Sequence, residues 1–172
     1  MEKKFELTDN FVINALGIKL FQIKCTKAFK NANEGDLGGY VEKEENLSQS
    51  GDAWVYGDAW VYGNAQVYGN AQVSGDARVS GNAQVYGDAR VSGDAQVEND
   101  HMHCGFDCFG SCNRHTHAYM TNENKVEIRC GCFRGSIEEF ERKVKETHAG
   151  TIYEKQYKAI INLIKIKFGI DG

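Results

Sequence analysis

The chain has 172 residues, and its 24 acidic and 20 basic side chains give a formal net charge of −4. The charge is uneven, because residues 39–98 hold nine acidic and three basic side chains. This argues against ordinary nucleic-acid binding, which needs cations facing the phosphates. Hydrophobic residues make up 41% of the chain, which is enough for a core, yet no apolar run approaches a membrane span. The first ten residues lack the apolar stretch of a secretory signal, so we expect a cytoplasmic protein without a membrane segment.

Residues 1–38 are expected to form an N-terminal β segment that caps the repeats that follow it. Residues 18–25 have the composition of a strand, and residues 11–14 are typical of a second, shorter one. The sequence Ala15-Leu16-Gly17 between them favours a turn that folds the two strands together. The glycine-rich residues 36–39 then lead into the repetitive part of the chain.

Eight tandem hexapeptides follow from Gly51 to Glu98: GDAWVY, GDAWVY, GNAQVY, GNAQVS, GDARVS, GNAQVY, GDARVS and GDAQVE. A fixed period determines how a chain must stack, and six residues suit one short strand plus a corner. Counting backwards in sixes places Val41 and Leu47 in the alanine column, so the repeats are expected to start near Gly39. Residues 39–98 are therefore predicted to form a parallel β-solenoid.

Within each hexapeptide the valine and the alanine two residues before it lie on one face of a strand. These side chains should point inward, while glycine followed by Asp or Asn supplies the corner. Three hexapeptides close one triangular coil, so residues eighteen apart should stack at about 4.8 Å. Proline is absent from the chain, so no backbone donor is missing from the strand ladders.

The outward positions predict a surface for a protein partner. Asp58, Asp76 and Asp94 stack as an all-acidic edge, and Tyr68 lies below Tyr86. Asp can also simply cap corners, and aromatic residues can simply cover coils. Two neighbouring tryptophans that are expected to be exposed favour an interface, because aromatic anchors are enriched there. The predicted partner-binding residues are Trp54, Trp60, Asp58, Asp76 and Asp94.

The hexapeptides resemble those of the left-handed β-helix family, whose loose pattern places an aliphatic and a small residue at fixed positions. Residues 55–60 match that pattern at Val55 and Ala59 and depart from it at Tyr56, where the family usually has a smaller residue. The left-handed coiling is implied by this resemblance alone, since ordinary crossovers are right-handed. The resemblance also implies that a homo-oligomer is possible.

Residues 99–172 are predicted to form a small Cys/His-rich α/β cap over the open end of the solenoid. Residues 113–120 and 125–133 are typical of a hairpin, and a register that pairs Thr121 with Val126 would place His117 opposite Cys130. Ser136 and Glu139 form a capping box that opens a helix ending before Gly150. A second helix is expected over about residues 153–168.

The cap contains seven potential metal ligands within seventeen residues, from His101 to His117. A reduced compartment favours metal binding or burial for its cysteines, and zinc prefers four Cys or His ligands. Two alternative ligand sets are consistent with the sequence. One is Cys130 and Cys132 with His115 and His117, and the other is the three earlier cysteines with a later histidine. Cys130 and Cys132 can equally be core residues. We predict a structural zinc site from His103, Cys104, Cys108, Cys112, His115 and His117, with Cys130 and Cys132 less favoured.

Catalysis is not expected. Hexapeptide acyltransferases use a histidine on or beside the solenoid, and residues 1–100 contain none. No catalytic residue is therefore predicted, and an acyltransferase remains the alternative. A solenoid that sequesters signalling nucleotides between subunits is a further alternative.

The segments KLFQIKCTKAFKN, DLGGYVEKEENLSQSG and CGCFRGSIEEFERKVKETH resemble hexapeptide proteins of phages and prophages. In those proteins the CGCF-G segment occurs without the neighbouring His/Cys cluster, which implies that Cys130 and Cys132 are core residues. Small proteins of mobile elements often inhibit host defences. The resemblance thus implies an anti-CRISPR-like inhibitor in the host cytoplasm that binds a basic nuclease such as Cas9 and makes no direct contact with nucleic acid.

Overall fold

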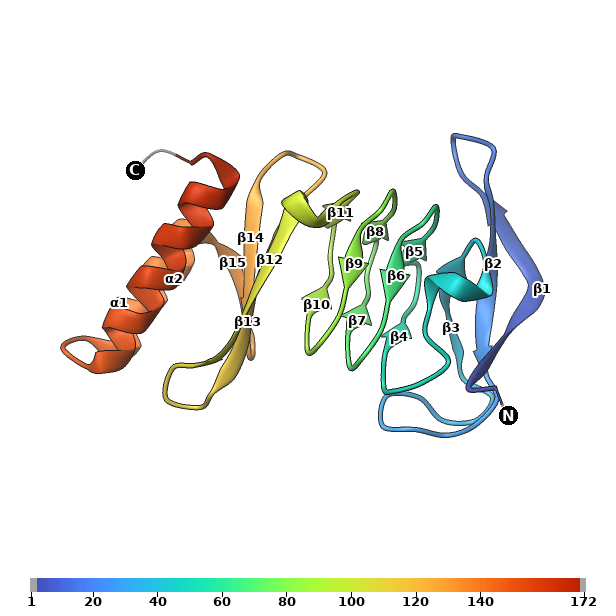
Figure 1. Ribbon diagram of the computed structural model, residues 1–172, viewed down its shortest axis with the longest axis horizontal. Helices are drawn as coiled ribbons and strands as arrows, with labels where there is room; N and C mark the ends of the chain where they lie inside the picture. The colour runs from blue at the N-terminus through green and yellow to red at the C-terminus, as the bar shows by residue number, and fades with distance from the viewer. Residues whose placement is uncertain (1–2, 171–172) are drawn as a thin grey trace. The chain divides into compact units, whose positions relative to one another are not determined.

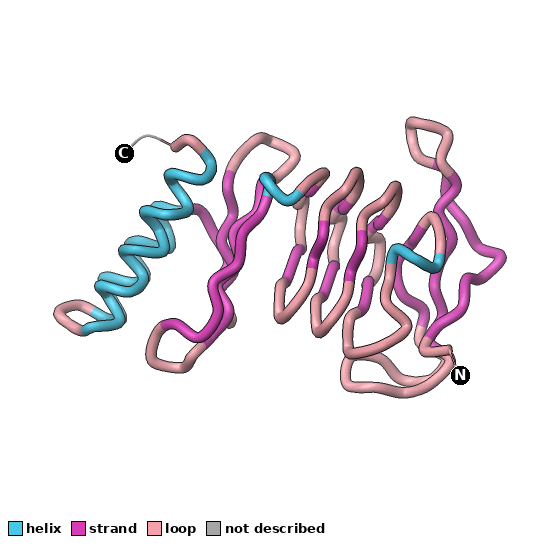
Figure 2. Tube along the Cα trace, viewed as in Figure 1, coloured by secondary structure: helices cyan, strands magenta, loops and turns pink. Residues whose placement is uncertain are grey.

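The computed structural model describes residues 3–170; residues 1–2 and 171–172, at the outer ends of the predicted segments 1–38 and 99–172, lie outside the described residues. The chain forms two compact units, one through Asp100 and the other from His101 onward. The first contains a parallel β-solenoid of about three turns, and both α-helices lie in the second (Figures 1 and 2). The predicted fold class, mainly β with a small helical C-terminal part, is confirmed.

The first unit opens with the predicted hairpin. Strands β1 (Phe5–Ile13) and β2 (Lys19–Cys25) pair antiparallel across a turn that contains Gly17 at φ 78°. Strand β2 also pairs antiparallel with β3 (Leu37–Val41). Because β3 belongs to the first coil, the hairpin extends one face of the solenoid.

Three parallel faces make up the solenoid. They are β3-β5-β8-β11, which continues the sheet of β1 and β2, together with β4-β7-β10 and β6-β9. The paired residues are eighteen apart in the repeats, as in Trp54 to Gln72 and Gln72 to Arg90, which confirms the predicted register. The strands are β4 (Trp54–Val55), β5 (Trp60–Val61), β6 (Gln66–Val67), β7 (Gln72–Val73), β8 (Arg78–Val79), β9 (Gln84–Val85), β10 (Arg90–Val91) and β11 (Gln96–Val97).

The interior of the coils contains the predicted columns. Every repeat valine is at most 1% exposed, and every repeat alanine at most 4%. The glycine that opens each hexapeptide has a positive φ, between 56° and 72°, a conformation that residues with a Cβ rarely adopt. Hydrophobic burial and corner geometry thus repeat together along the chain.

The first coil departs from the predicted columns. Val41 pairs with Val61, and Leu47 bridges to Val67, so both lie in the valine column. The prediction that they continue the alanine column is wrong, because these partners are twenty residues apart. The spacing from Val41 to Leu47, which includes the 3-10 helix η1 (Glu44–Asn46), is still six residues. The two additional residues therefore lie in the loop between Leu47 and Gly51.

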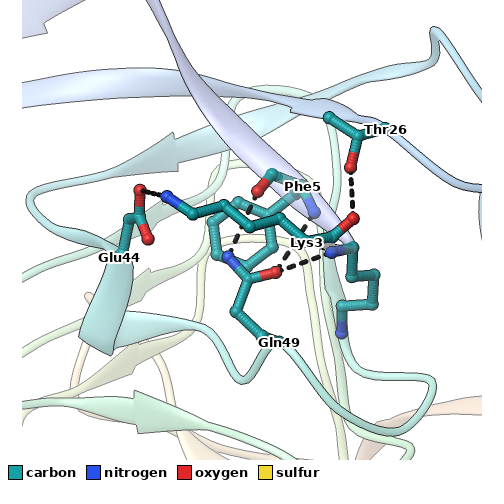
Figure 3. Close-up of polar contacts among 6 residues, drawn as sticks. Lys3, Phe5, Thr26, Glu44 and Gln49 are labelled. Atoms are coloured by element: carbon teal, nitrogen blue, oxygen red, sulfur yellow. Dashed lines mark hydrogen bonds and ion pairs between the residues drawn. The ribbon is translucent and has the colours of Figure 1, made fainter. Parts of the chain in front are cut away.

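The N-terminal strand is attached to the first coil by side-chain hydrogen bonds (Figure 3). The Gln49 amide oxygen accepts from the backbone N–H groups of Lys4 and Phe5, at 2.8 and 3.3 Å, and its Nε2 donates to the Phe5 carbonyl. Lys3 Nζ lies 2.6 Å from a carboxylate oxygen of Glu44. The Lys4 ammonium is buried and donates to the carbonyl of Ala53 at 2.8 Å. Such contacts satisfy carbonyls that the end coil would otherwise leave unpaired.

The second unit is an antiparallel sheet with two helices on one face. The apolar side of the sheet packs on the helices through Ala118, Ile128, Phe140, Ile160 and Ile164. After the 3-10 helix η2 (Asp100–Met102), the elements are β12 (His103–Phe109), β13 (Arg114–Met120), β14 (Val126–Cys130), β15 (Phe133–Ser136), α1 (Ile137–His148) and α2 (Ile152–Phe168). The sheet order is β12-β13-β14-β15.

The local predictions for this unit hold, but the strand register does not. Ser136 caps α1 in a reciprocal capping box with Glu139, and Gly150 follows the helix end, as predicted. The hairpin of β13 and β14 is also present, but Met120, not Thr121, pairs with Val126. The predicted register is wrong by one residue because β13 ends at Met120, and the Thr121 N–H donates to the Lys125 carbonyl across the connection to β14. A one-residue shift moves every side chain to the other face.

Candidate functional site

One corner of the solenoid presents an uncompensated stack of carboxylates. Asp58, Asp76 and Asp94 are all exposed and follow the corner glycines of successive coils. Two residues later, Trp60, Arg78 and Gln96 pair in sequence, which fixes the stacking of this corner. Within residues 3–170, none of the three carboxylates takes part in a hydrogen bond or ion pair. We call this ladder the acidic corner.

The other two corners have polar side chains that pair with one another. Asn70 donates to the carboxylate of Asp88 at 3.0 Å, and Asn64 donates to Asn82 at 3.3 Å. An amide beside a carboxylate supplies donors without adding charge. At the acidic corner no amide intervenes. Like charges at the strand spacing of about 5 Å would repel by about 0.8 kcal/mol even in water. A cationic ligand would relieve that repulsion.

The two tryptophans differ in exposure. Trp54 is only 1% exposed and makes edge contacts with Phe5 and Phe29, at centroid distances of 6.4 and 5.5 Å. The prediction that Trp54 is exposed is therefore wrong, because the N-terminal segment covers it. Trp60 is partly buried, and the Arg78 guanidinium lies 4.6 Å from its ring centre. Of the two, Trp60 alone remains available beside the acidic corner.

The predicted ligand cluster separates into two groups because β12 is a strand. Alternation along β12 places His103, Gly105 and Asp107 on one face and Cys104 and Phe106 on the other. Cys104 packs against the helical core, where burial raises the pKa of its thiol to about 11. Cys108 and Cys112 are exposed at the end of the hairpin. The structure thus separates the three cysteines from the histidines.

The register of β13 also separates His117 from Cys130. Thr116 lies opposite Cys130, and His117 lies opposite Arg129. Cys130 is buried in the core, with its sulfur 3.3 Å from the Thr116 hydroxyl. Cys132 is exposed in the turn before β15. The predicted sharing of one face by Cys130, Cys132, His115 and His117 is therefore wrong.

The histidines themselves come together on the sheet face opposite the helices. His103 Nδ1 lies 3.0 Å from His117 Nε2, and His115 Nδ1 lies 2.5 Å from an Asp107 carboxylate oxygen. The His115 and His117 ring centres are 5.6 Å apart. Among the described residues, no group of three or more His, Cys, Asp or Glu side chains is already arranged to hold a metal ion. The arrangement is a pair of interacting imidazoles with a third beside it.

Sequence reasoning did not identify Asp107 as part of this cluster. The prediction grouped potential ligands by their spacing along the chain. In the structure, the side chains that meet are those on the same face of a strand. The alternation HCGFDCF over β12 contained the relevant signal, because it places His103 and Asp107 on the same side. Lys4 was also missed, and nothing in its sequence surroundings marks it as buried.

These features define a β-solenoid repeat protein with an additional sheet-and-helix unit. The family model for the YdcK beta solenoid repeat matches residues 71–84 and 83–99. Both segments lie in the later coils, and the second ends just after β11. The match therefore supports the repeat and leaves the rest of the chain unassigned. A search of curated proteins found no match. No helix within residues 3–170 is long and apolar enough to cross a bilayer.

Proposed function

We propose that the protein is a non-enzymatic binding protein whose acidic corner engages a positively charged protein partner. The observation that supports this proposal is the stack of three exposed, unpaired carboxylates on a backbone fixed by strand pairing. Charges fixed in position lose little conformational freedom on binding, which favours recognition by preorganisation. Trp60 and Arg78 lie on the neighbouring face and supply an aromatic contact beside the charges.

The proposed partner is a host nuclease of the CRISPR-Cas9 type, and the proposed origin of the chain is a phage or mobile element. Such a nuclease holds nucleic acid in a positively charged channel. A ladder of carboxylates is complementary to those cations, and occupying them would block the nucleic acid. A structural zinc ion in the unit from His101 onward belongs to the same proposal.

A matched pair of double variants tests the acidic corner. Asp76→Asn/Asp94→Asn and Asp52→Asn/Asp88→Asn each remove two negative charges from a corner ladder. We expect the first variant to weaken nuclease binding at least tenfold and the second to change it less than threefold. Affinity for the unmodified chain should also fall as salt is raised. Binding is measured by biolayer interferometry and inhibition by a DNA-cleavage assay.

Several outcomes would contradict the proposal. Equal affinity for the two double variants would mean that net charge, and not this corner, governs binding. Absence of binding to any nuclease tested, with cleavage unaffected, would remove the proposed partner. Turnover of acetyl-CoA by the purified chain would contradict the non-enzymatic assignment.

A further inference from the structure

Three imidazoles and one carboxylate gather over Gly105, on the sheet face away from the helices. Gly105 of β12 pairs directly with His117 of β13. A Cβ at Gly105 would lie 2.6 Å from Cε1 of His115 and 3.0 Å from its Nε2. The His115 ring therefore lies directly on the glycine, in space that any larger residue would fill. This brings His115 towards His117 instead of leaving it at the sheet surface.

The His103 and His117 pair has nearly the separation of two ligands on one metal ion. Two nitrogens bound to a tetrahedral zinc at about 2.05 Å are about 3.3 Å apart, with ring centres about 5.2 Å apart. Here Nδ1 of His103 and Nε2 of His117 are 3.0 Å apart, and the ring centres are separated by 5.3 Å. A small outward movement of either ring would admit a metal ion between the two nitrogens.

The contacts of His115 are those of a histidine that binds a metal through Nε2. Its Nδ1 bonds to the Asp107 carboxylate, which holds the proton on Nδ1 and leaves the lone pair on Nε2. That Nε2 is buried and has no hydrogen-bond partner among the described residues. A buried nitrogen without a partner is unfavourable unless something binds it. Its ring centre is 5.6 Å from that of His117, again close to the separation expected for two ligands of one zinc.

We propose that His103, His115 and His117 bind one divalent transition-metal ion, with Zn²⁺ as the expected metal. His103 Nδ1 and His117 Nε2 form the fixed part of the site, and His115 Nε2 turns towards them on binding. Asp107 orients His115 without binding the metal. Three imidazoles suit zinc and leave its fourth position for a further ligand, which distinguishes this site from a structural zinc closed by four protein ligands. This inference rests on the metal-binding part of the proposed function and narrows its ligands to histidines.

The test is metal binding by the full chain after chelator treatment and dialysis. Zinc content is measured by elemental analysis and affinity by competition with a chromophoric chelator. We expect one zinc per chain, and at least a hundredfold loss of affinity in His115→Ala and His117→Ala. His148→Ala is the matched control on α1, and Cys108→Ser/Cys112→Ser tests the rival ligands; both should bind zinc as the unmodified chain does.

Cobalt substitution distinguishes failure of this inference from failure of the proposed function. An all-histidine site gives no thiolate-to-cobalt charge-transfer band in the ultraviolet. A strong band that is lost in Cys108→Ser/Cys112→Ser would overturn the histidine site while leaving metal binding itself intact. Less than one tenth of an equivalent of zinc, in the unmodified chain and after reconstitution, would overturn both. Neither result affects the acidic corner.

Asp107→Asn keeps the test valid if a histidine variant fails to fold. Asp107 is 63% exposed at its side chain, so its amide isostere should leave the sheet intact, as circular dichroism would check. Loss of a carboxylate that orients a ligand typically weakens metal binding 10–100-fold. We expect a reduction in that range, with the stoichiometry unchanged. Unchanged zinc affinity in Asp107→Asn would contradict the role of Asp107 and of His115 as its metal-binding partner.

Discussion

Residues 51–56 and 57–62 have the same sequence, GDAWVY, yet they differ in almost every contact beyond the backbone. Trp54 is buried against the N-terminal segment, whereas Trp60 is only partly buried and contacts Arg78. Tyr56 donates to the carbonyl of Asn31 at 3.0 Å. The comparison shows that the repeat determines the path of the chain, while distant segments decide what each side chain meets.

The largest difference between the two hexapeptides is expected at the tryptophans. Trp54→Ala removes a fully buried ring from its contacts with Phe5 and Phe29 and should cost about 3 to 5 kcal/mol of unfolding free energy. Trp60→Ala loses a partly buried ring and a cation–π contact and should cost about 1 to 2 kcal/mol. Urea denaturation followed by circular dichroism measures both. Equal losses would mean that the N-terminal segment does not cover Trp54 in solution.

The second-largest difference in stability is expected at the corner glycines. Gly51 and Gly57 both have positive φ, 71° and 56°, so alanine is strained by about 1 to 2 kcal/mol at either position. At Gly51 an added Cβ would also lie 2.6 Å from the carbonyl oxygen of Gly69, whereas at Gly57 nothing lies within 4 Å. We expect Gly51→Ala to cost about 1 to 2 kcal/mol more than Gly57→Ala. The same denaturation experiment measures the difference, and the reverse order would contradict the stacking of these two corners.

The burial of Lys4 against the first hexapeptide predicts that the free energy of unfolding depends on pH. Among residues 3–170, the second hexapeptide has no such contact with Lys4. The Lys4 ammonium donates to the Ala53 carbonyl, and burial lowers its pKa from 10.5 to about 8, partly offset by Asp52. The folded pKa is below the unfolded value, so the unfolded chain binds more protons between pH 8 and 10.5. Stability should therefore rise with pH across that window. Lys4→Met should lack this rise when unfolding free energies at pH 7 and pH 9.5 are compared.

Direct titration of the lysine side chains by NMR checks the lowered pKa of Lys4 independently of stability. One lysine signal should titrate near pH 8 and disappear in Lys4→Met. A lysine spectrum in which every signal titrates near 10.5 would mean that Lys4 is solvated, and the first coil would then lack this contact.

The smallest expected difference is at the tyrosines. Tyr56→Phe removes the hydrogen bond to Asn31 and should cost about 1 kcal/mol. Tyr62→Phe, the matched variant, removes a hydroxyl that has no hydrogen bond within the described residues and should change stability by less than about 0.5 kcal/mol. Thermal denaturation resolves a difference of this size. A larger loss from Tyr62→Phe would indicate that its hydroxyl is bound in solution.

Much of the fold follows from the sequence because each signal is local. The eighteen-residue register, the N-terminal hairpin and the capping box at Ser136 were all predicted from spacing or from a few neighbouring residues. The position of Leu47 was not, because a two-residue insertion leaves no mark on a period that is already degenerate there. The register of β13 and β14 failed for a similar reason, since either Met120 or Thr121 could have ended the strand.

The candidate sites could be predicted only in part. The sequence places Asp58, Asp76 and Asp94 in one ladder, because the period alone decides which residues stack. It also locates the histidines of the second unit, but not their grouping. His103 and His115 are twelve residues apart, and whether they meet depends on which residues of β12 and β13 pair.

The sequence by itself therefore determined the solenoid, its buried columns and the composition of each corner, since strand pairing simply repeats one hexapeptide geometry. Only the tertiary structure decided that Trp54 is covered, that Cys104 and Cys130 lie in the core, and that three histidines share one face with Asp107. The physical reason is the range of the interactions. A period sets contacts at a constant sequence separation, whereas burial and ligand geometry depend on segments that the fold brings together from unrelated positions.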